Sequence, residues 1–179
     1  MNNKNIIFGL TGSIACYKAC SVISKLVQYG AEVRTVCSKN ALNFVGKATL
    51  EGLTKKQTLV DMFERESYTT HIDLAKWADL YVICPATANI INKFASGIAD
   101  DYLSTIFLSW RLKEKPLLIF PAMNENMYDH PLTQKSIEKL KGIGAVVADT
   151  EFGSLACGDK GKGRLLEPET IIEIIKKYL

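Results

Sequence analysis

Short apolar runs alternate along the chain with longer segments in which apolar residues recur every three or four positions. The short runs predict buried strands at residues 6–10, 32–37, 79–84, 116–120 and 145–148. The helical spacing predicts helices over residues 14–29, 40–45, 87–96, 102–112, 131–141 and 167–179. Strands that alternate with helices in this way indicate a doubly wound α/β fold, in which helices cover both faces of a parallel sheet.

Ligands of such sheets bind beyond the carboxyl ends of the strands. The segments expected at that edge are residues 11–13, 38–40, 85–89 and 121–124. Residues 47–73 follow neither period, and Gly52, Thr54 and the charges between residues 61 and 66 suggest a short strand and loops. The glycine-rich residues 153–163 predict another loop. Because no linker or repeat interrupts the pattern, we expect a single domain over residues 1–179.

The composition narrows the class of protein. Of the 179 residues, 47% are hydrophobic and 23% are charged, and the net charge is +3, as is ordinary for a globular domain. The basic residues are scattered, so no nucleic-acid surface is expected. No apolar run reaches the roughly 18 residues that span a bilayer. The first residues lack the apolar core of a secretion signal, so we expect a cytoplasmic protein.

The five cysteines differ in their surroundings. Cys16, Cys20, Cys37 and Cys84 lie in apolar stretches, where a reduced cysteine behaves as a small hydrophobe. Cys157 lies apart in the glycine-rich segment, near basic residues that could favour its thiolate. The odd count and the absence of a Cys-x-x-Cys pair indicate a reducing compartment and predict no metal site.

Two strand exits carry residue types suited to an anion or cofactor. Gly12 allows close approach of a ligand to the backbone, and Ser13 can cap the next helix or donate to an anion at its N-terminus. The turn lacks the full dinucleotide fingerprint, so a phosphate site and a simple capped turn both stay open. Thr87, Ala88 and Asn89 either form a second wall of the pocket or begin another capped helix.

Three further residues could carry chemistry. His71 can act as an acid or base near neutral pH, although a lone histidine beside apolar residues is often structural. Asn124 offers a donor and an acceptor to a carboxylate or amide, or serves as a turn residue. Cys157 lies either on a lid over a site or in an ordinary surface loop.

Taken together and in this order, the motifs resemble the homo-oligomeric flavin-containing cysteine decarboxylases over residues 6–168. The matching motifs are Gly-Ser-Ile at 12–14, His-Ile-x-Leu-x-x-Trp-Ala-Asp at 71–79, Pro-Ala-Thr-Ala-Asn at 85–89, Pro-Ala-Met-Asn-x-x-Met at 121–127 and Ala-Cys-Gly-Asp-x-Gly-x-Gly-Arg at 156–164. The last three together are specific. The resemblance implies a flavodoxin-like, Rossmann-like sheet and a homotrimer, or a dodecamer of such trimers.

The resemblance also implies roles for single residues. His71 would be a catalytic histidine presented across a subunit contact. Asn124 would bind the substrate carboxylate beside Met127. Cys157, with Ala156, would close over the substrate and donate a proton. FMN would be held by residues from successive strand exits, namely Gly12, Ser13, Ile14, Ser38, Thr87, Ala88, Asn89, Ser104, Thr105 and Ala122.

The implied reaction is the FMN-dependent decarboxylation of 4′-phosphopantothenoylcysteine to 4′-phosphopantetheine in coenzyme A synthesis, with a separate synthetase as the source of the substrate. The cysteine carbon–sulfur unit would be oxidised to a thioaldehyde, lose CO2 and be reduced again from the ene-thiol. Two alternatives stand beside it. Peptidyl-cysteine decarboxylases of lantibiotic type stop at the ene-thiol and lack the cysteine flap, which is intact here. A regulatory flavoprotein of the same fold would have no activity.

Two departures from the family pattern matter. Asp100 and Asp101 stand where relatives often have an asparagine beside the aspartate, which leaves their contact with flavin or substrate open. Many bacterial relatives carry a second, ligase domain. We therefore expect either a stand-alone decarboxylase or one part of a longer enzyme.

Overall fold

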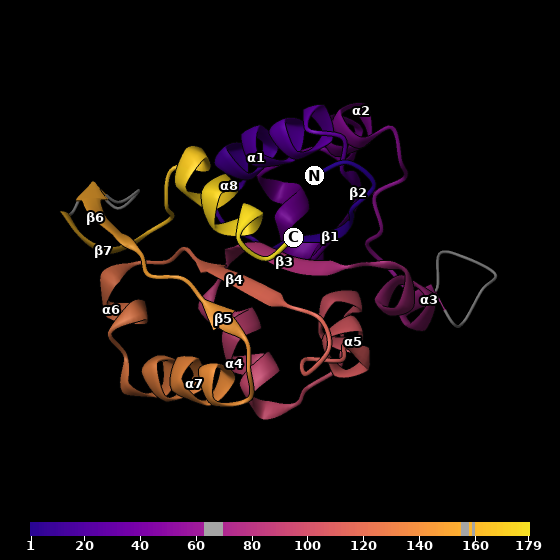
Figure 1. Cartoon of the computed structure of the whole chain (residues 1–179). Coiled ribbons are helices and arrows are strands. Elements are labelled where there is room, and N and C mark those ends of the chain that lie inside the picture. Colours follow the sequence, from indigo (N-terminus) through magenta and orange to yellow (C-terminus); the bar gives the residue numbers. More distant parts are fainter. Residues whose placement is uncertain (63–69, 155–157, 159) are drawn as a thin grey trace.

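Five parallel strands form the central sheet of the computed structural model, which describes residues 1–62, 70–154, 158 and 160–179 (Figure 1). The strands are β1 (Asn5–Leu10), β2 (Glu32–Cys37), β3 (Leu80–Ala86), β4 (Leu117–Pro121) and β5 (Val146–Val147). Their order is β2-β1-β3-β4-β5, and every neighbouring pair is parallel. This confirms the predicted fold class. In such an order the winding reverses between β1 and β3, which opens a crevice at their carboxyl ends.

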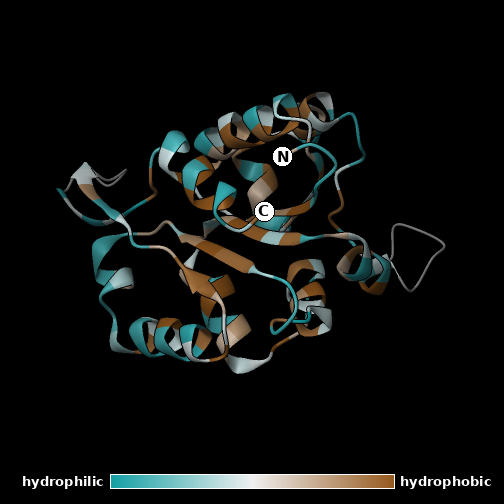
Figure 2. Cartoon of the chain, in the orientation of Figure 1, coloured by the Kyte–Doolittle hydropathy of each residue, from teal (hydrophilic) through white to brown (hydrophobic). Residues whose placement is uncertain are grey.

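Helices cover both faces of the sheet. One face packs against α1 (Cys16–Gln28), α2 (Lys47–Thr54) and α8 (Pro168–Lys176). The other packs against α3 (Thr70–Trp77), α4 (Ala88–Ser96), α5 (Tyr102–Ser109) and α7 (Pro131–Gly142). Two short helical turns, η1 (Lys39–Asn43) and α6 (Glu125–Tyr128), follow β2 and β4. Figure 2 shows strands that are mostly hydrophobic and helices whose hydrophilic sides face outward.

Alternate strand residues supply two hydrophobic cores. In β1, Ile6 and Phe8 belong to the core on the α1 side, whereas Ile7 belongs to the other. Tyr81 of β3 is fully buried, and its hydroxyl donates to the carbonyl of Leu103 at 3.0 Å. Burying one such side chain contributes about 1.5–3 kcal/mol. Packing on both faces therefore fixes β1 and β3 at the centre of the sheet, and with them the crevice between their ends.

The prediction of a short strand and loops over residues 47–73 was wrong at its start, where α2 forms. Leu50 is fully buried, and the hydroxyl of Thr54 donates to the Leu50 carbonyl at 2.9 Å. Gly52 costs about 1 kcal/mol in a helix, but it lies on the exposed side, and the burial of Leu50 outweighs it. Further along, Leu59 forms a single parallel bridge with Val36 of β2, close to the strand that was expected.

The same prediction was wrong at its end, where α3 forms. Leu74 and Ala75 are buried, and a distant side chain holds the last turn of the helix. The ammonium of Lys115 donates to the carbonyls of Ala75, Lys76 and Ala78 at 3.0, 2.7 and 2.6 Å. A cation at this end satisfies carbonyls that lack helical partners and interacts favourably with the helix dipole. A local pattern cannot show a contact made across the sequence.

The described residues of the glycine-rich segment form an antiparallel hairpin. The prediction of a loop over residues 153–163 was therefore wrong for these residues. The hairpin consists of β6 (Glu151–Ser154) and β7 (Lys160–Arg164) and lies at the left of Figure 1. Its glycines fit a strand because they are close-packed: Gly161 and Gly163 are both buried.

Several predicted helices are shorter in the structure. Residues 14–15 form a turn, so α1 begins at Cys16. The backbone of Trp110 is extended, so α5 ends at Ser109. Over the described parts of the chain, no helix combines the length and the apolar character needed to cross a membrane.

Candidate functional site

Two adjoining cavities lie at the carboxyl edge of the sheet, and the predicted segments meet there. The first cavity has a volume of about 650 Å³ and is lined by Ser13, Asn124 and the hairpin, among others. The second has about 630 Å³ and is lined by Ser38, Asn89 and residues of α4 and α5. Gly12, Thr87 and Met127 line both, so the two cavities share one wall. All four predicted strand-exit segments contribute to this pair of cavities.

The shared wall is built where the exits of β1 and β3 are joined. The Thr11 hydroxyl donates to the Pro85 carbonyl at 2.7 Å and accepts from the Thr87 amide at 3.0 Å. A Cβ on Gly12 would lie 2.8 Å from the Cβ of Asn40, so glycine is required there. The Thr87 side chain makes no capping bond to α4, which favours the pocket-wall interpretation of this residue. Thr11, which the sequence did not single out, holds this wall together.

Ser13 and Ile14 complete the turn before α1. The Ser13 hydroxyl accepts from the Ala15 amide at 3.3 Å, and Ile14 is exposed at the rim of the first cavity. The amides at the start of a helix favour an anion. The Ser13 hydroxyl closes this turn but does not cap α1, whose N-cap residue is Ala15 and has no side-chain capping bond. The phosphate site stays a prediction.

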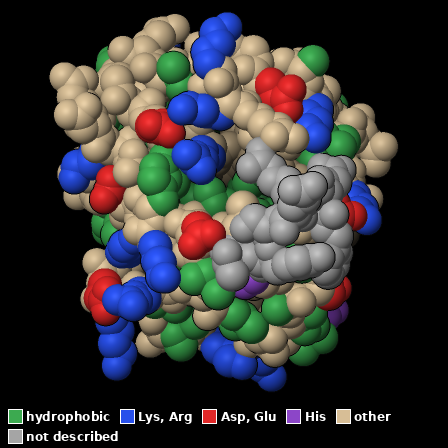
Figure 3. Space-filling model, turned by 90° about the vertical axis from the view of Figure 1, so that its right-hand side faces the viewer, with side chains coloured by type: hydrophobic (Ala, Val, Ile, Leu, Met, Phe, Trp, Pro, Cys, Tyr) green, Lys and Arg blue, Asp and Glu red, His purple; other side chains and the backbone are tan. Residues whose placement is uncertain are grey.

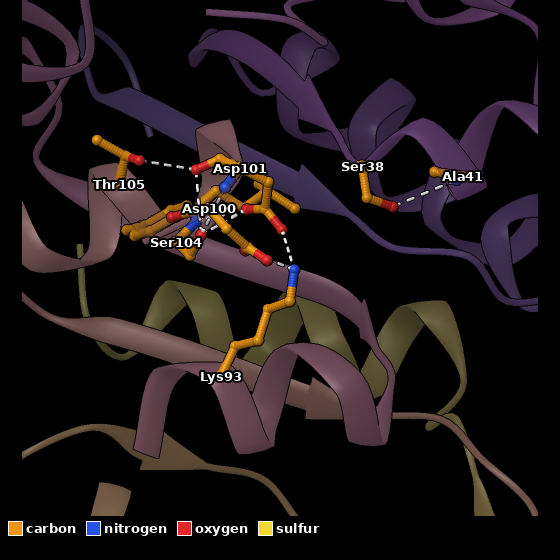
Figure 4. A network of polar contacts seen from close by, with 9 residues as sticks. Ser38, Ala41, Lys93, Asp100, Asp101, Ser104 and Thr105 are labelled. Carbon is orange, nitrogen blue, oxygen red and sulfur yellow. Dashed lines mark hydrogen bonds and ion pairs between the residues drawn. The ribbon is translucent and has the colours of Figure 1, made fainter. Parts of the chain in front are cut away.

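A charged cluster forms one wall of the second cavity. The Lys93 ammonium bonds Asp100 at 2.6 Å and Asp101 at 2.9 Å (Figure 4). Burial alone would raise the pKa of Asp101, but the Ser104 amide and the Lys93 ammonium outweigh it and hold that pKa below its usual value. Burial opposes the charge on Lys93, yet the two aspartates raise its pKa. Lys93 and Asp101 are thus held in their charged forms, and the cluster is internally paired.

Ser104 and Thr105, predicted to hold FMN, lie beneath this cluster. Asp101 caps α5: its carboxylate accepts from the Ser104 amide and hydroxyl, both at 2.8 Å. The Thr105 hydroxyl donates to the Asp101 carbonyl at 2.8 Å. Ser104 is fully buried, and neither residue is among the described lining of the two cavities. On the opposite wall, the Ser38 hydroxyl accepts from the Ala41 amide at 3.3 Å (Figure 4).

Asn124 lies at the first cavity, at the start of α6. Its side-chain oxygen accepts from the Asn126 amide at 2.9 Å and so caps this short helix. The preceding Ala122 is buried, and its amide donates to the Ala86 carbonyl of β3 at 2.9 Å. Met127 is half exposed at the boundary of the two cavities. The turn residue predicted from sequence is therefore also a cavity residue.

Opposite Asn124, buried and half-buried charges fix the base of the hairpin. The Lys18 ammonium is buried and donates to the Leu165 carbonyl at 3.1 Å and to Glu167 at 2.9 Å. Arg164 pairs with Glu167 at 2.6 Å and with Glu151 at 3.6 Å. The hydrogen bond from Lys18 lowers the pKa of Glu167. Lys18 was missed, although a lysine in line with the apolar Val22 and Leu26 of α1 is a signal for a buried charge.

His71 lies away from these cavities. It is half-buried in α3, on the side of Figure 1 opposite the hairpin, and is not among the described residues that line either cavity. Ile72 of α3 and Leu108 of α5 are exposed, and Figure 3 shows hydrophobic side chains gathered on this side of the molecule. Ala156 and Cys157, the other predicted residues, lie outside the described residues.

The other four cysteines carry inert thiols. Burial raises the pKa of Cys16 to about 11 and that of Cys37 to about 12, and it also raises the pKa values of Cys20 and Cys84. Three are buried and Cys20 is half-buried, as expected for small hydrophobes in the core. In the described part of the chain, no group of three or more His, Cys, Asp or Glu side chains could hold a metal ion.

Known proteins resemble the chain over its whole length. A family model described as Flavoprotein matches residues 1–179. The coenzyme A biosynthesis bifunctional protein CoaBC of Bacillus subtilis (strain 168) is 44% identical over 180 residues, which are 99% of this chain. The CoaBC protein of Haemophilus influenzae is 39% identical over 181 residues, again 99% of this chain. The chain spans 44% of the length of both relatives.

Solved structures share the fold. A mutant PPC decarboxylase complexed with pantothenoylaminoethenethiol superimposes with a TM-score of 0.87 and 29% identity, over 99% of this chain and 98% of that one. The FMN binding protein AtHal3 gives a TM-score of 0.84 and 30% identity, over 99% and 97% of the two chains. EpiD from Staphylococcus aureus, an epidermin biosynthesis protein, gives 0.82 and 31%, over 96% and 99%.

Proposed function

The chain belongs to the Flavoprotein family, and from this premise we propose that it decarboxylates 4′-phosphopantothenoylcysteine to 4′-phosphopantetheine with bound FMN. The observation that carries the proposal is the convergence of Gly12, Thr87 and Asn124 on one cavity. Similarity to CoaBC proteins and to PPC decarboxylase supports the substrate. A cytoplasmic location, one flavin domain over residues 1–179 and a separate synthetase belong to the same proposal.

The residues present fit a flavin phosphate and its chain. A glycine that tolerates no Cβ, amides at the start of α1 and a Thr87 side chain without a capping bond together form a cradle for an anion. Ser38 and Asn89 supply polar groups in the adjoining second cavity. We propose that FMN is held by Gly12, Ser13, Ile14, Ser38, Thr87, Ala88, Asn89 and Ala122, with Ser104 and Thr105 acting through the α5 cap.

Asn124 binds the substrate carboxylate in this proposal. Its side chain lies at the first cavity and is oriented by the cap that it makes to α6. Met127 provides an apolar wall beside it. The two cations that line this cavity in the described part of the chain, Lys18 and Arg164, are already paired with Glu167. A carboxylate that is about to leave as CO2 must be held without strong charge pairing, because an unpaired cation nearby would stabilise the ionised ground state. A neutral amide meets that need.

His71 acts, in this proposal, in the cavity of a neighbouring subunit. Its place on α3, away from the cavities of its own chain, and the exposed Ile72 and Leu108 nearby support a contact between copies there. We infer a homotrimer, or trimers assembled into a dodecamer, in which each α3 completes a neighbouring site. The imidazole would then hold or move a proton at the reacting carboxylate or thiol.

When bound, FMN supplies a two-electron oxidation of the substrate carbon–sulfur unit to a thioaldehyde and returns the same two electrons after CO2 has left. The net reaction therefore replaces a carboxyl group by a proton and consumes no external oxidant. Cys157 gives the proton that completes the saturated thiol, with Ala156 beside it. Asn124 and His71 serve the first half of the reaction, and Cys157 serves the second.

Purified protein tests this proposal directly. We expect a flavin absorbance spectrum and release of CO2 with saturated thiol from phosphopantothenoylcysteine. Cys157→Ser should still release CO2 but accumulate the oxidised ene-thiol. The half-buried control, Cys20→Ser, should release CO2 and give the normal saturated thiol. His71→Asn should bind flavin and lose decarboxylation. A saturated product from Cys157→Ser, or full activity in His71→Asn, would remove those roles.

Similarity to EpiD, named as a peptidyl-cysteine decarboxylase, leaves a second candidate, the decarboxylation of a peptidyl-cysteine. The Cys157 segment favours the first candidate because an enzyme that stops at the ene-thiol needs no proton donor for reduction. A C-terminal cysteine peptide offered to the same protein separates the two. Flavin binding without turnover of either substrate would instead indicate a regulatory flavoprotein.

A further inference from the structure

We propose that Glu125 is a positioning residue that holds the β6–β7 hairpin against the Asn124 segment. The inference rests on the proposed function, in which the carboxylate lies at Asn124 and the saturated product requires Cys157. Glu125 is the first residue of α6 and follows Asn124 directly. Its side chain is half-buried, and none of the roles given above uses its carboxylate.

The carboxylate of Glu125 touches the backbone of β7. Its Oε1 accepts from the Lys162 amide at 3.0 Å. A Cβ on the neighbouring Gly161 would lie 2.5 Å from the Glu125 carboxyl carbon. Gly161 is buried, although the residues on either side of it are exposed. β7 thus lies directly against this carboxylate, and a side chain at position 161 would displace the carboxylate from its present position.

A second contact joins β7 to the other side of Asn124. The Met123 amide donates to the Gly163 carbonyl at 2.9 Å. Gly163 has a φ of +98°, and a side chain there would overlap the Met123 carbonyl oxygen. The Gly163 amide in turn donates to the Thr150 hydroxyl at 3.0 Å. Two hydrogen bonds, one before and one after Asn124, therefore bind the strand to this segment.

The two contacts differ in kind. The bond from Met123 is made by backbone atoms and does not depend on side-chain identity. The bond from Lys162 requires an acceptor at position 125. A hydrogen bond to a charged acceptor is stronger than a neutral one, so Glu125 sets how firmly the outer part of β7 is held. In the proposed function, Asn124 and the proton donor serve one substrate in succession. Glu125 accordingly acts on the second half of the reaction and leaves the first unchanged.

The main test measures products in the flavin-loaded protein. Glu125→Ala should release CO2 at the wild-type rate while the share of ene-thiol rises roughly tenfold, since loss of one such bond shifts a docking equilibrium by about that factor. Glu125→Gln keeps an acceptor oxygen and should restore most of the saturated product. Glu138→Ala, an exposed acidic residue on α7, is the matched control. A wild-type product ratio in Glu125→Ala would overturn the inference.

Gly161→Ala provides an independent test should Glu125→Ala fold poorly. The new methyl group would push the Glu125 carboxylate away, so ene-thiol should accumulate. Adding Gly161→Ala to the Glu125→Ala variant should not raise the share of ene-thiol any further. Amide hydrogen exchange over residues 160–164 should speed up in both single variants, and unchanged exchange would overturn the inference. A wild-type protein that releases no CO2 would refute the proposed function instead, and exchange would still decide the contact.

Discussion

The two cavities share Gly12, Thr87 and Met127, yet their other walls differ in kind. Large apolar side chains, Tyr17 and Phe44, stand at the first cavity, and both are substantially exposed. Lys18 and Arg164, the cations described at the first cavity, pair with Glu167. The second cavity is lined by lysines and aspartates that pair with one another. An apolar ring suits the first environment, whereas hydroxyl groups suit the second.

This difference shows how one crevice can serve both a cofactor and a reaction. The polar wall is already satisfied internally: Lys93 is bonded to both aspartates, and Asp101 caps α5. Such a wall binds by shape and by added hydrogen bonds, and among its described residues three aspartates outnumber two lysines. The first cavity ends at Asn124 and at the hairpin, which face the substrate in the proposed function. We therefore expect changes at the Asn124 and hairpin end of the first cavity to alter turnover, and changes in the shared wall or the second cavity to alter flavin affinity.

Asn124→Ala should produce the largest effect, and this effect should be a loss of turnover. Loss of the amide that binds the carboxylate should lower kcat/KM for decarboxylation about a hundredfold, whereas the flavin spectrum stays unchanged. Stopped-flow CO2 measurement together with flavin absorbance would check this. Loss of bound flavin in this variant would show that the two cavities do not divide the work as described.

Gly12→Ala should come next, because it alters the shared wall. The added methyl group would lie against Asn40, and overpacking of this kind costs about 1–3 kcal/mol. Flavin affinity should fall about tenfold, and turnover should return when FMN is in excess. Gly52→Ala, at an exposed position with open space around it, is the control. Fluorescence titration with FMN gives both values.

Lys93→Met should have a smaller effect, confined to the second cavity. Asp100 and Asp101 would lose their common partner, so flavin affinity should fall about fivefold while kcat at saturating FMN stays close to the wild-type value. Lys56→Met removes an exposed lysine that pairs with Glu32 and serves as a control. A changed kcat with unchanged flavin affinity would reverse the assignment of the two cavities.

The smallest expected effect is a change in the pH at which thermal stability begins to fall. The pKa of Asp101 is lower in the folded protein than its usual value of about 3.9. Its contribution to stability is therefore present above that usual value and is lost as the pH falls through the lower, folded value. In Lys93→Met the pKa of Asp101 should rise, so the thermal midpoint should begin to drop at a higher pH. Thermal unfolding followed from pH 6 down to about pH 2 would measure the difference.

The sequence predicted the central features well for physical reasons. Continuous apolar runs mark strands buried on both faces, so β1, β3 and β4 lie within a residue or two of their predictions. Parallel strands place their exits at one edge, so Gly12, Thr87 and Asn124 meet as predicted. These inferences need only local patterns and one rule of topology.

What the sequence did not show depends on contacts made across the chain. The Lys115 ammonium donates to carbonyls at the end of α3, and the Thr11 hydroxyl joins two turns that are 74 residues apart. The glycines of β7 read as a loop because their partners, Met123 and Glu125, belong to another segment. The roles of His71 and Cys157 stay predictions.

The Lys115 contact has a consequence for how this surface can change over time. It holds α3 through three main-chain carbonyls, which every amino acid possesses. Outward-facing side chains such as Ile72 and Lys76 can therefore be replaced without loosening the helix. Because this contact does not depend on side-chain identity, the exposed residues of α3 can be substituted during evolution, and the surface can change its charge or the partner that it fits. The backbone that carries His71 would keep its position.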